Sequence, residues 1–171
     1  MERIPLLEST DGLSETQREI FDWVVESRGK MIRPYEVLLH SPGLARPAAE
    51  LGHQIRYEGE LSDHDRELAI ITAAKAHDCA FEWDSHVDIA RSSGVSETAI
   101  TALETGQGEF SDSEAVIVNF VRQLCADSDI GDETFTAVSK QLGSSGPVVE
   151  LAGLVGYYTF LAYVMKVAGA C

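Results

Sequence analysis

A thiol, a carboxylic acid and an imidazole lie within eight residues of one another, at Cys79, Glu82 and His86. At about 100° per residue, one α-helix carries all three side chains within about 60° of a single face. A carboxyl group beside an imidazole can exchange protons near neutral pH, so this stripe indicates an acid–base site. The alternative is a solvated Glu–His pair beside a buried cysteine.

Histidines and carboxylates are also metal ligands, and His77, Glu82 and His86 occupy the same stretch. The three lack the His-Glu-x-x-His spacing of zinc proteases. A single helix would moreover place His77 and His86 on opposite sides. We therefore expect no metal site.

The stretch that carries these residues has the composition of a helix. Residues 66–93 follow the cap Ser62-Asp-His-Asp65 and stop at Gly94, in the pattern of helix start and stop signals. A helix of nearly thirty residues is long for a globular protein. We predict a break near His77-Asp78, with two helices that meet at an angle.

The rest of the chain shows similar start and stop signals for helices and few signals for strands. We therefore predict an all-α fold of about eight or nine helices, in one domain over residues 1–171, because no linker is long enough to divide the chain. The other predicted helices span residues 18–27, 34–40, 44–57, 96–104, 111–126 and 132–142, with a last helix that opens at Pro147.

The composition limits the partners. The 171 residues carry 13 Lys+Arg and 28 Asp+Glu, for a net charge of −15. Such a surface repels nucleic acid and anionic lipid, so we expect neither as a partner. The amino terminus lacks a secretory pattern, and three cysteines suit no disulfide framework, so we expect a cytoplasmic protein with reduced thiols.

The longest uncharged stretch, residues 151–165, falls short of the roughly 20 residues that a membrane span needs. We interpret it as a core or subunit-interface helix. Tyr157, Tyr158 and Tyr163 are accordingly expected to be packing residues.

Several motifs together resemble the carboxymuconolactone decarboxylase family and its alkyl hydroperoxide reductase-like (AhpD-like) relatives. The resemblance covers about residues 30 to 105 and implies an all-helical bundle whose protomers assemble into trimers or hexamers. The motifs are Leu38-Leu39-His40-Ser41-Pro42-Gly43-Leu44, Arg66-Glu67-Leu68-Ala69-Ile70, Phe81-Glu82-Trp83 with His86, and Ala90, Gly94-Val95-Ser96 and Ile100.

The peroxidase-related branch of this family implies a Cys-x-x-Cys redox pair with a Glu and a His as proton relay. Glu67, Cys79 and His86 match that pattern, but Glu82 occupies the position of the second thiol. A carboxylate cannot resolve a sulfenic acid, so no local disulfide can form there. A redox role for Cys79 would need a distant partner, either Cys125 or Cys171.

The decarboxylase branch implies a Glu–His pair and an enzyme that needs neither metal nor organic cofactor. We therefore predict a carboxy-lyase that acts on a small carboxylated lactone or a related unsaturated acid. The protein must supply a dry pocket, a donor for the developing oxyanion and an acid. We expect His86 to be the donor or acid, Glu82 to orient it, Glu67 to hold the relay and Cys79 to line the pocket.

Three further residues are candidates for substrate contact. Trp83 either lines the pocket or packs in the hydrophobic core without a role in binding. Arg56 and Tyr57, with His53, either meet a substrate carboxylate or form a half-exposed helix face. Two other functions stay open: a different Glu/His proton transfer, such as isomerisation, hydration or lactone opening, and a non-catalytic interaction protein.

Overall fold

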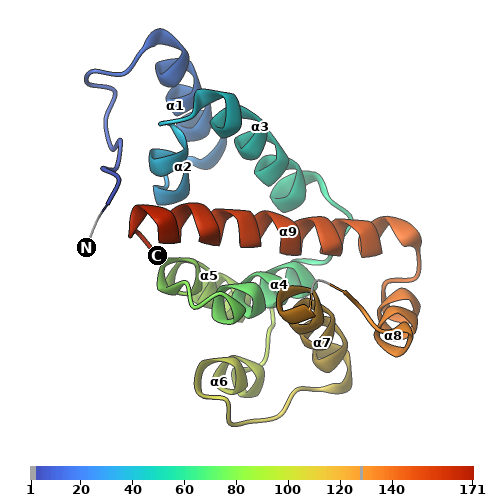
Figure 1. Ribbon diagram of the computed structural model, residues 1–171. Helices are drawn as coiled ribbons and strands as arrows, with labels where there is room; N and C mark the ends of the chain where they lie inside the picture. The colour runs from blue at the N-terminus through green and yellow to red at the C-terminus, as the bar shows by residue number, and fades with distance from the viewer. Residues whose placement is uncertain (1–2, 128) are drawn as a thin grey trace. The chain divides into compact units, whose positions relative to one another are not determined.

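The computed structural model describes residues 3–127 and 129–171, which fold into two compact units. One unit contains the described part of Met1–Glu58 together with Tyr163–Cys171, and the other contains Gly59–Ala162. Figure 1 shows helices throughout: the described residues form nine α-helices, one π-helix and no strand. The predicted all-α fold is confirmed, while the single domain over residues 1–171 stays a prediction.

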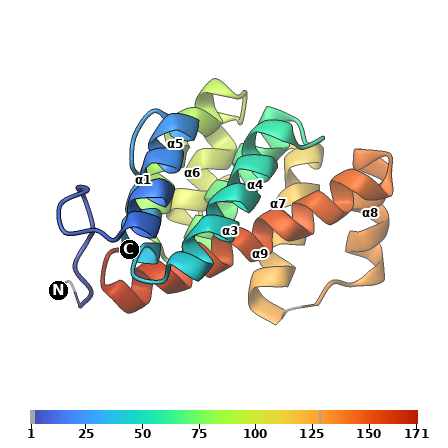
Figure 2. The ribbon, with the colours of Figure 1, turned by 90° about the horizontal axis from the view of Figure 1, so that it is seen from above.

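In the first unit, α3 packs against α1, α2 and η1, and α1 and α3 can be followed in Figure 2. The Arg28 guanidinium joins these helices, because it donates to the Tyr35 hydroxyl at 2.9 Å and to the Ala49 carbonyl at 3.0 Å. The elements of this unit are α1 (Glu15–Arg28), α2 (Arg33–Leu38), α3 (Pro42–His53), η1 (Gln54–Glu58) and the end of α9 (Ser145–Ala168) from Tyr163 onward.

The π-helix η1 differs from the prediction of one helix over residues 44–57. The α-helical pattern ends at His53, and Gln54–Glu58 continues with the wider π turn. A π turn depends on its tertiary surroundings and leaves no mark in local composition. The sequence therefore predicted the extent of the helical segment but not this change of pitch.

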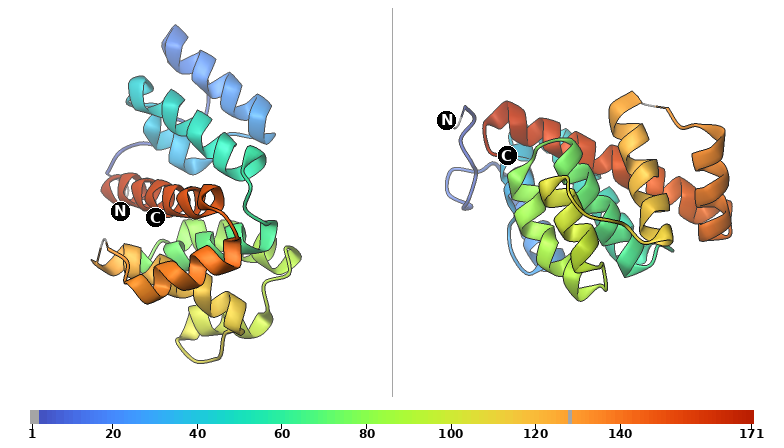
Figure 3. Two further views of the ribbon diagram at one scale, coloured as in Figure 1. Left: turned by 90° about the vertical axis from the view of Figure 1, so that its right-hand side faces the viewer. Right: turned by 90° about the horizontal axis from the view of Figure 1, so that it is seen from below.

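The second unit is built around α4. Its residues 67–74 are all buried, the pattern of a helix enclosed on every side, and it contacts α5, α6 and α7. Figure 3 shows these helices from two further sides. The elements of this unit are α4 (Asp63–Ala76), α5 (Ala80–Ser92), α6 (Glu97–Thr105), α7 (Asp112–Asp127), α8 (Asp132–Leu142) and the part of α9 (Ser145–Ala168) up to Ala162.

The predicted break between the two central helices is confirmed. Helix α4 ends at Ala76 and α5 begins at Ala80. Between them Asp78 adopts φ 46°, the left-handed conformation that non-glycine residues rarely take. The His77 ring, through Nε2, forms a 2.7 Å hydrogen bond with the Thr159 hydroxyl of α9. The chain thereby turns so that α5 packs along α4.

Helix α9 has 24 residues and extends beyond the uncharged stretch at both ends. By length and composition it is long and apolar enough to cross a membrane, a test that buried core helices also pass. Its Leu151, Leu154, Tyr158 and Leu161 recur at helical spacing and are buried. The Glu150 carboxylate accepts the backbone N–H of Glu60 at 2.7 Å. The absence of a membrane partner stays a prediction.

Candidate active site

Two acidic residues and a histidine meet in the interior of the second unit. The His86 ring from α5 donates through Nδ1 to Glu67 Oε2 of α4 at 2.8 Å. On its other side, His86 Nε2 lies 3.8 Å from Glu82 Oε2, one helical turn earlier on α5. Glu67 is fully buried, and Glu82 and His86 are 4% and 5% exposed. The packing of α5 on α4 thus unites residues that are 19 positions apart.

The Glu67 carboxylate fixes the tautomer of this histidine. A carboxylate can only accept, so the neutral ring carries its proton on Nδ1 and directs the Nε2 lone pair toward Glu82. Taking up a second proton at Nε2 creates an imidazolium between two carboxylates. The arrangement can therefore bind and release a proton at Nε2, which is the chemistry of a general acid or base.

A tyrosine from α9 completes this cluster. The Tyr158 hydroxyl lies 3.5 Å from His86 Nε2, and the two rings are perpendicular with centroids 5.5 Å apart. Tyr158 is predicted to be a packing residue, and it is buried at 3% exposure. The structure adds a polar contact to that packing. Nothing in local spacing could reveal it, because 72 positions separate the two residues.

Three residues near this cluster lie on α4 or at the start of α5. Arg66 Nη2 donates to Asp63 at 2.7 Å, and Arg66 Nε lies 3.6 Å from Glu67 Oε1. Cys79 is the N-cap residue of α5 and is buried, one turn before Glu82. It is disulfide-bonded, so the expectation of reduced thiols is wrong for this residue. Trp83 is also buried, with the Lys75 ammonium 4.8 Å from its ring centroid. The pocket-lining roles of Cys79 and Trp83 stay predictions.

The other two substrate-binding candidates lie in η1 of the first unit. Tyr57 is 54% exposed, and its ring centroid is 5.0 Å from that of His53. The Arg56 guanidinium carbon lies 5.7 Å from the Tyr57 ring centroid. This contact set describes a partly exposed cationic and aromatic face, and a role of Arg56 and Tyr57 in substrate binding stays a prediction.

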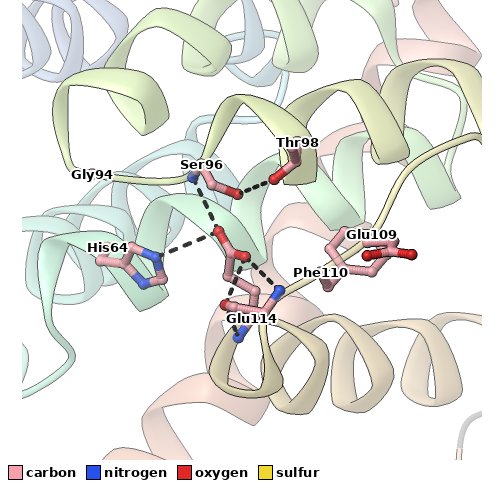
Figure 4. Close-up of a pocket in the computed structure, with 8 residues that line it drawn as sticks. His64, Gly94, Ser96, Thr98, Glu109, Phe110 and Glu114 are labelled. Atoms are coloured by element: carbon pink, nitrogen blue, oxygen red, sulfur yellow. Dashed lines mark hydrogen bonds and ion pairs between the residues drawn. The ribbon is translucent and has the colours of Figure 1, made fainter.

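A second glutamate–histidine pair borders a surface hollow of about 500 Å³ where the chain enters α4, α6 and α7 (Figure 4). Burial raises the pKa of Glu114, but hydrogen bonds from Ser111 and Ser96 outweigh it and lower the value to about 2. The carboxylate accepts the backbone N–H of Ser96 at 3.0 Å, and the backbone N–H and hydroxyl of Ser111 at 2.9 and 2.7 Å. His64 Nε2 is 4.0 Å away.

This second pair is therefore built as a helix cap. Ser96 and Ser111 each precede the first turn of a helix, α6 and α7, whose initial N–H groups need acceptors. One carboxylate serves both helices. The Ser-Asp-Ser-Glu sequence at residues 111–114, where the predicted helix over residues 111–126 begins, has the form of a capping box, whereas the bond to Ser96 follows from tertiary packing. Among the described residues, no group of three His, Cys, Asp or Glu side chains is arranged to hold a metal ion.

Comparisons with known proteins agree with this architecture. The crystal structure of the debrominase Bmp8 in its apo form has a TM-score of 0.77 at 14% sequence identity, over 99% of this chain and 91% of that one. A variant of the same debrominase in complex with 2,3,4-tribromopyrrole gives the same TM-score and identity, over 100% and 91%. At this identity the likeness concerns the fold. A comparison with curated protein sequences finds no match.

The sequence profile of a protein family matches residues 42–122, the stretch from α3 to α7 that includes Glu67, Glu82 and His86. This match confirms the resemblance seen in the motifs. Over this stretch the chain matches the profile of the carboxymuconolactone decarboxylase family.

Proposed function

We propose that the protein is a carboxy-lyase that removes CO2 from a small carboxylated lactone or related unsaturated acid, of the 4-carboxymuconolactone type. The observation that carries this proposal is the buried network of Glu67, His86 and Glu82, which can hold and release a proton at Nε2 away from the surface. The match of residues 42–122 to the family profile adds support, because the family is named for this reaction.

The reaction consumes one proton. The bond between the substrate ring and its carboxylate breaks, CO2 leaves, and the electron pair moves into the conjugated lactone carbonyl as a dienolate. The imidazolium of His86 then gives its Nε2 proton to carbon, which restores the neutral lactone. The neutral ring regains a proton from water before the next turnover.

The two carboxylates have different tasks, and the orienting task expected of Glu82 passes to Glu67, which is the one within hydrogen-bond distance of the ring. Glu67 accepts the Nδ1 proton at 2.8 Å in both charge states of the ring and holds its orientation. Glu82, at 3.8 Å from Nε2, faces the nitrogen that gains and loses a proton and favours the imidazolium. The surrounding burial strengthens both interactions, because a low local dielectric weakens charges less than water does.

The proposal is tested with freshly generated 4-carboxymuconolactone, by following CO2 release and the lactone product. Wild type and Cys79→Ser should turn over within about threefold of each other, whereas Glu82→Gln should lose about 100-fold in kcat. No turnover by folded wild-type protein would exclude this substrate.

The same variants distinguish the redox alternative. If Cys79→Ser abolishes an activity that Glu82→Gln retains, the chemistry depends on the cysteine, and a peroxide or disulfide substrate replaces the lactone. If both variants keep full activity on the lactone, neither residue carries the reaction and the proposed site is wrong.

A further inference from the structure

Two groups with different hydrogen-bonding properties face the same atom of His86. The Tyr158 hydroxyl is 3.5 Å from Nε2 and the Glu82 carboxylate is 3.8 Å from it. A hydroxyl can donate to the lone pair of a neutral ring, whereas an ionised carboxylate can only accept from an imidazolium. The neutral and charged forms of His86 therefore each have a matching partner.

We propose that Tyr158 is a positioning residue that holds neutral His86 in the Nδ1–H tautomer, with Nε2 ready to take up a proton. The Tyr158 hydroxyl donates to Nε2 while the ring is neutral, and the contact passes to Glu82 when the ring gains its proton. The catalytic consequence rests on the proposed function, whereas the hydrogen bond itself is measured without any substrate.

The position of Tyr158 suits this task because packing fixes its ring. Tyr157 packs perpendicular to it, with centroids 5.4 Å apart. The next residue of α9, Thr159, bonds to His77 at the break that starts α5. Helix α9 therefore contacts the break through Thr159 and contacts His86 through Tyr158. A hydroxyl on so constrained a ring aligns with Nε2 at little further entropic cost.

Three elements of the second unit present ionisable groups to His86. They are Glu67 from α4, Glu82 from α5 and Tyr158 from α9. The two carboxylates favour the protonated ring, and the hydroxyl favours the neutral one. Deleting the hydroxyl should consequently shift His86 toward its protonated form, and deleting the Glu82 charge should shift it the other way.

The test is ¹⁵N NMR of histidine-labelled full-length protein as a function of pH, on wild type, Tyr158→Phe and Tyr157→Phe. We expect Tyr158→Phe to raise the pH midpoint of His86 protonation by about half to one unit. The Nε2 resonance should also move toward the position of a nitrogen with no hydrogen bond. Tyr157→Phe removes a neighbouring hydroxyl from the same helix and should leave both values unchanged.

The inference is overturned if Tyr158→Phe leaves the midpoint and the Nε2 resonance unchanged, or if Tyr157→Phe moves them equally. Should Tyr158→Phe fail to fold, the wild-type spectrum still decides, because a neutral ring with its proton on Nε2 contradicts the proposal. If the lactone is a substrate, Tyr158→Phe should lower kcat about 3- to 10-fold with KM unchanged. Expected NMR shifts without lactone turnover would support the Tyr158 inference and reject the proposed substrate.

Discussion

The second unit buries a glutamate near a histidine in two places, and the two pairs differ in what the carboxylate contacts. Around Glu114, two backbone N–H groups and a hydroxyl occupy the oxygens, and His64 stays 4.0 Å away. Around Glu67, the His86 ring itself donates to the carboxylate, at 2.8 Å. The Glu114 carboxylate accepts hydrogen bonds from the residues that begin α6 and α7, whereas the Glu67 carboxylate holds a histidine ring that can change its charge.

The difference separates a structural carboxylate from one suited to chemistry. Hydrogen bonds to Glu114 stabilise its charged form and lower its pKa to about 2, so it stays ionised at any physiological pH. A group that never changes protonation cannot relay a proton. His86 has partners for both of its charge states, as a relay requires. Burial and residue type alone would not have told the two pairs apart.

The largest effect should come from removing the ring that carries the proton. His86→Gln can still donate an N–H toward Glu67 but cannot transfer a proton at the Nε2 position. We expect kcat on the lactone to fall about 1,000-fold, within the usual range for a general acid. The matched control is His64→Gln beside Glu114, which should stay within about twofold of wild type. Equal losses of kcat in both variants would show that the two glutamate–histidine pairs do not differ in function.

Replacing the orienting carboxylate should have the next largest effect. Glu67→Gln keeps an acceptor for Nδ1–H but removes the charge that favours the imidazolium. We expect kcat to fall about 100-fold with a smaller change in KM, measured by initial rates of CO2 release. A variant with wild-type kcat would show that Glu67 is as structural as Glu114.

The capping carboxylate should matter for stability. Glu114→Gln introduces an amide NH2 among donors that already converge on this side chain. We expect the free energy of unfolding to fall by about 2 kcal/mol in urea titrations. In the wild type the pKa of Glu114 is depressed in the folded state, so its contribution is present above about pH 4.5 and is lost as the pH falls toward 2. The variant should lack this part of the acid dependence.

The smallest effect concerns the break that brings His86 to Glu67. Asp78 is exposed and has φ 46°, a conformation that glycine adopts without strain. Asp78→Gly should raise the free energy of unfolding by about 0.5–1 kcal/mol, after allowing for the greater freedom of glycine in the unfolded chain. Thermal unfolding at neutral pH measures this shift. A loss of stability would mean that the Asp78 side chain itself supports the break.

The sequence predicted most of the fold because its signals are local. Capping residues and glycines placed the helices, and the length of residues 66–93 indicated the break at His77-Asp78. The face shared by Glu82 and His86 follows from helical periodicity within α5. The contacts of Tyr158 and Thr159 with the two histidines depend on how α9 packs, and no local spacing encodes that. The π turn of η1 was likewise beyond prediction.

The most direct test of the account compares Glu82→Gln with Glu114→Gln in two assays run side by side, CO2 release from the lactone and unfolding in urea. We predict opposite results for the two variants: Glu82→Gln loses about 100-fold in kcat and stays within about 1 kcal/mol of wild-type stability, whereas Glu114→Gln loses about 2 kcal/mol of stability and keeps its kcat. If Glu82→Gln retains wild-type kcat while Glu114→Gln loses it in folded protein, the active site lies at the surface hollow and the account is wrong.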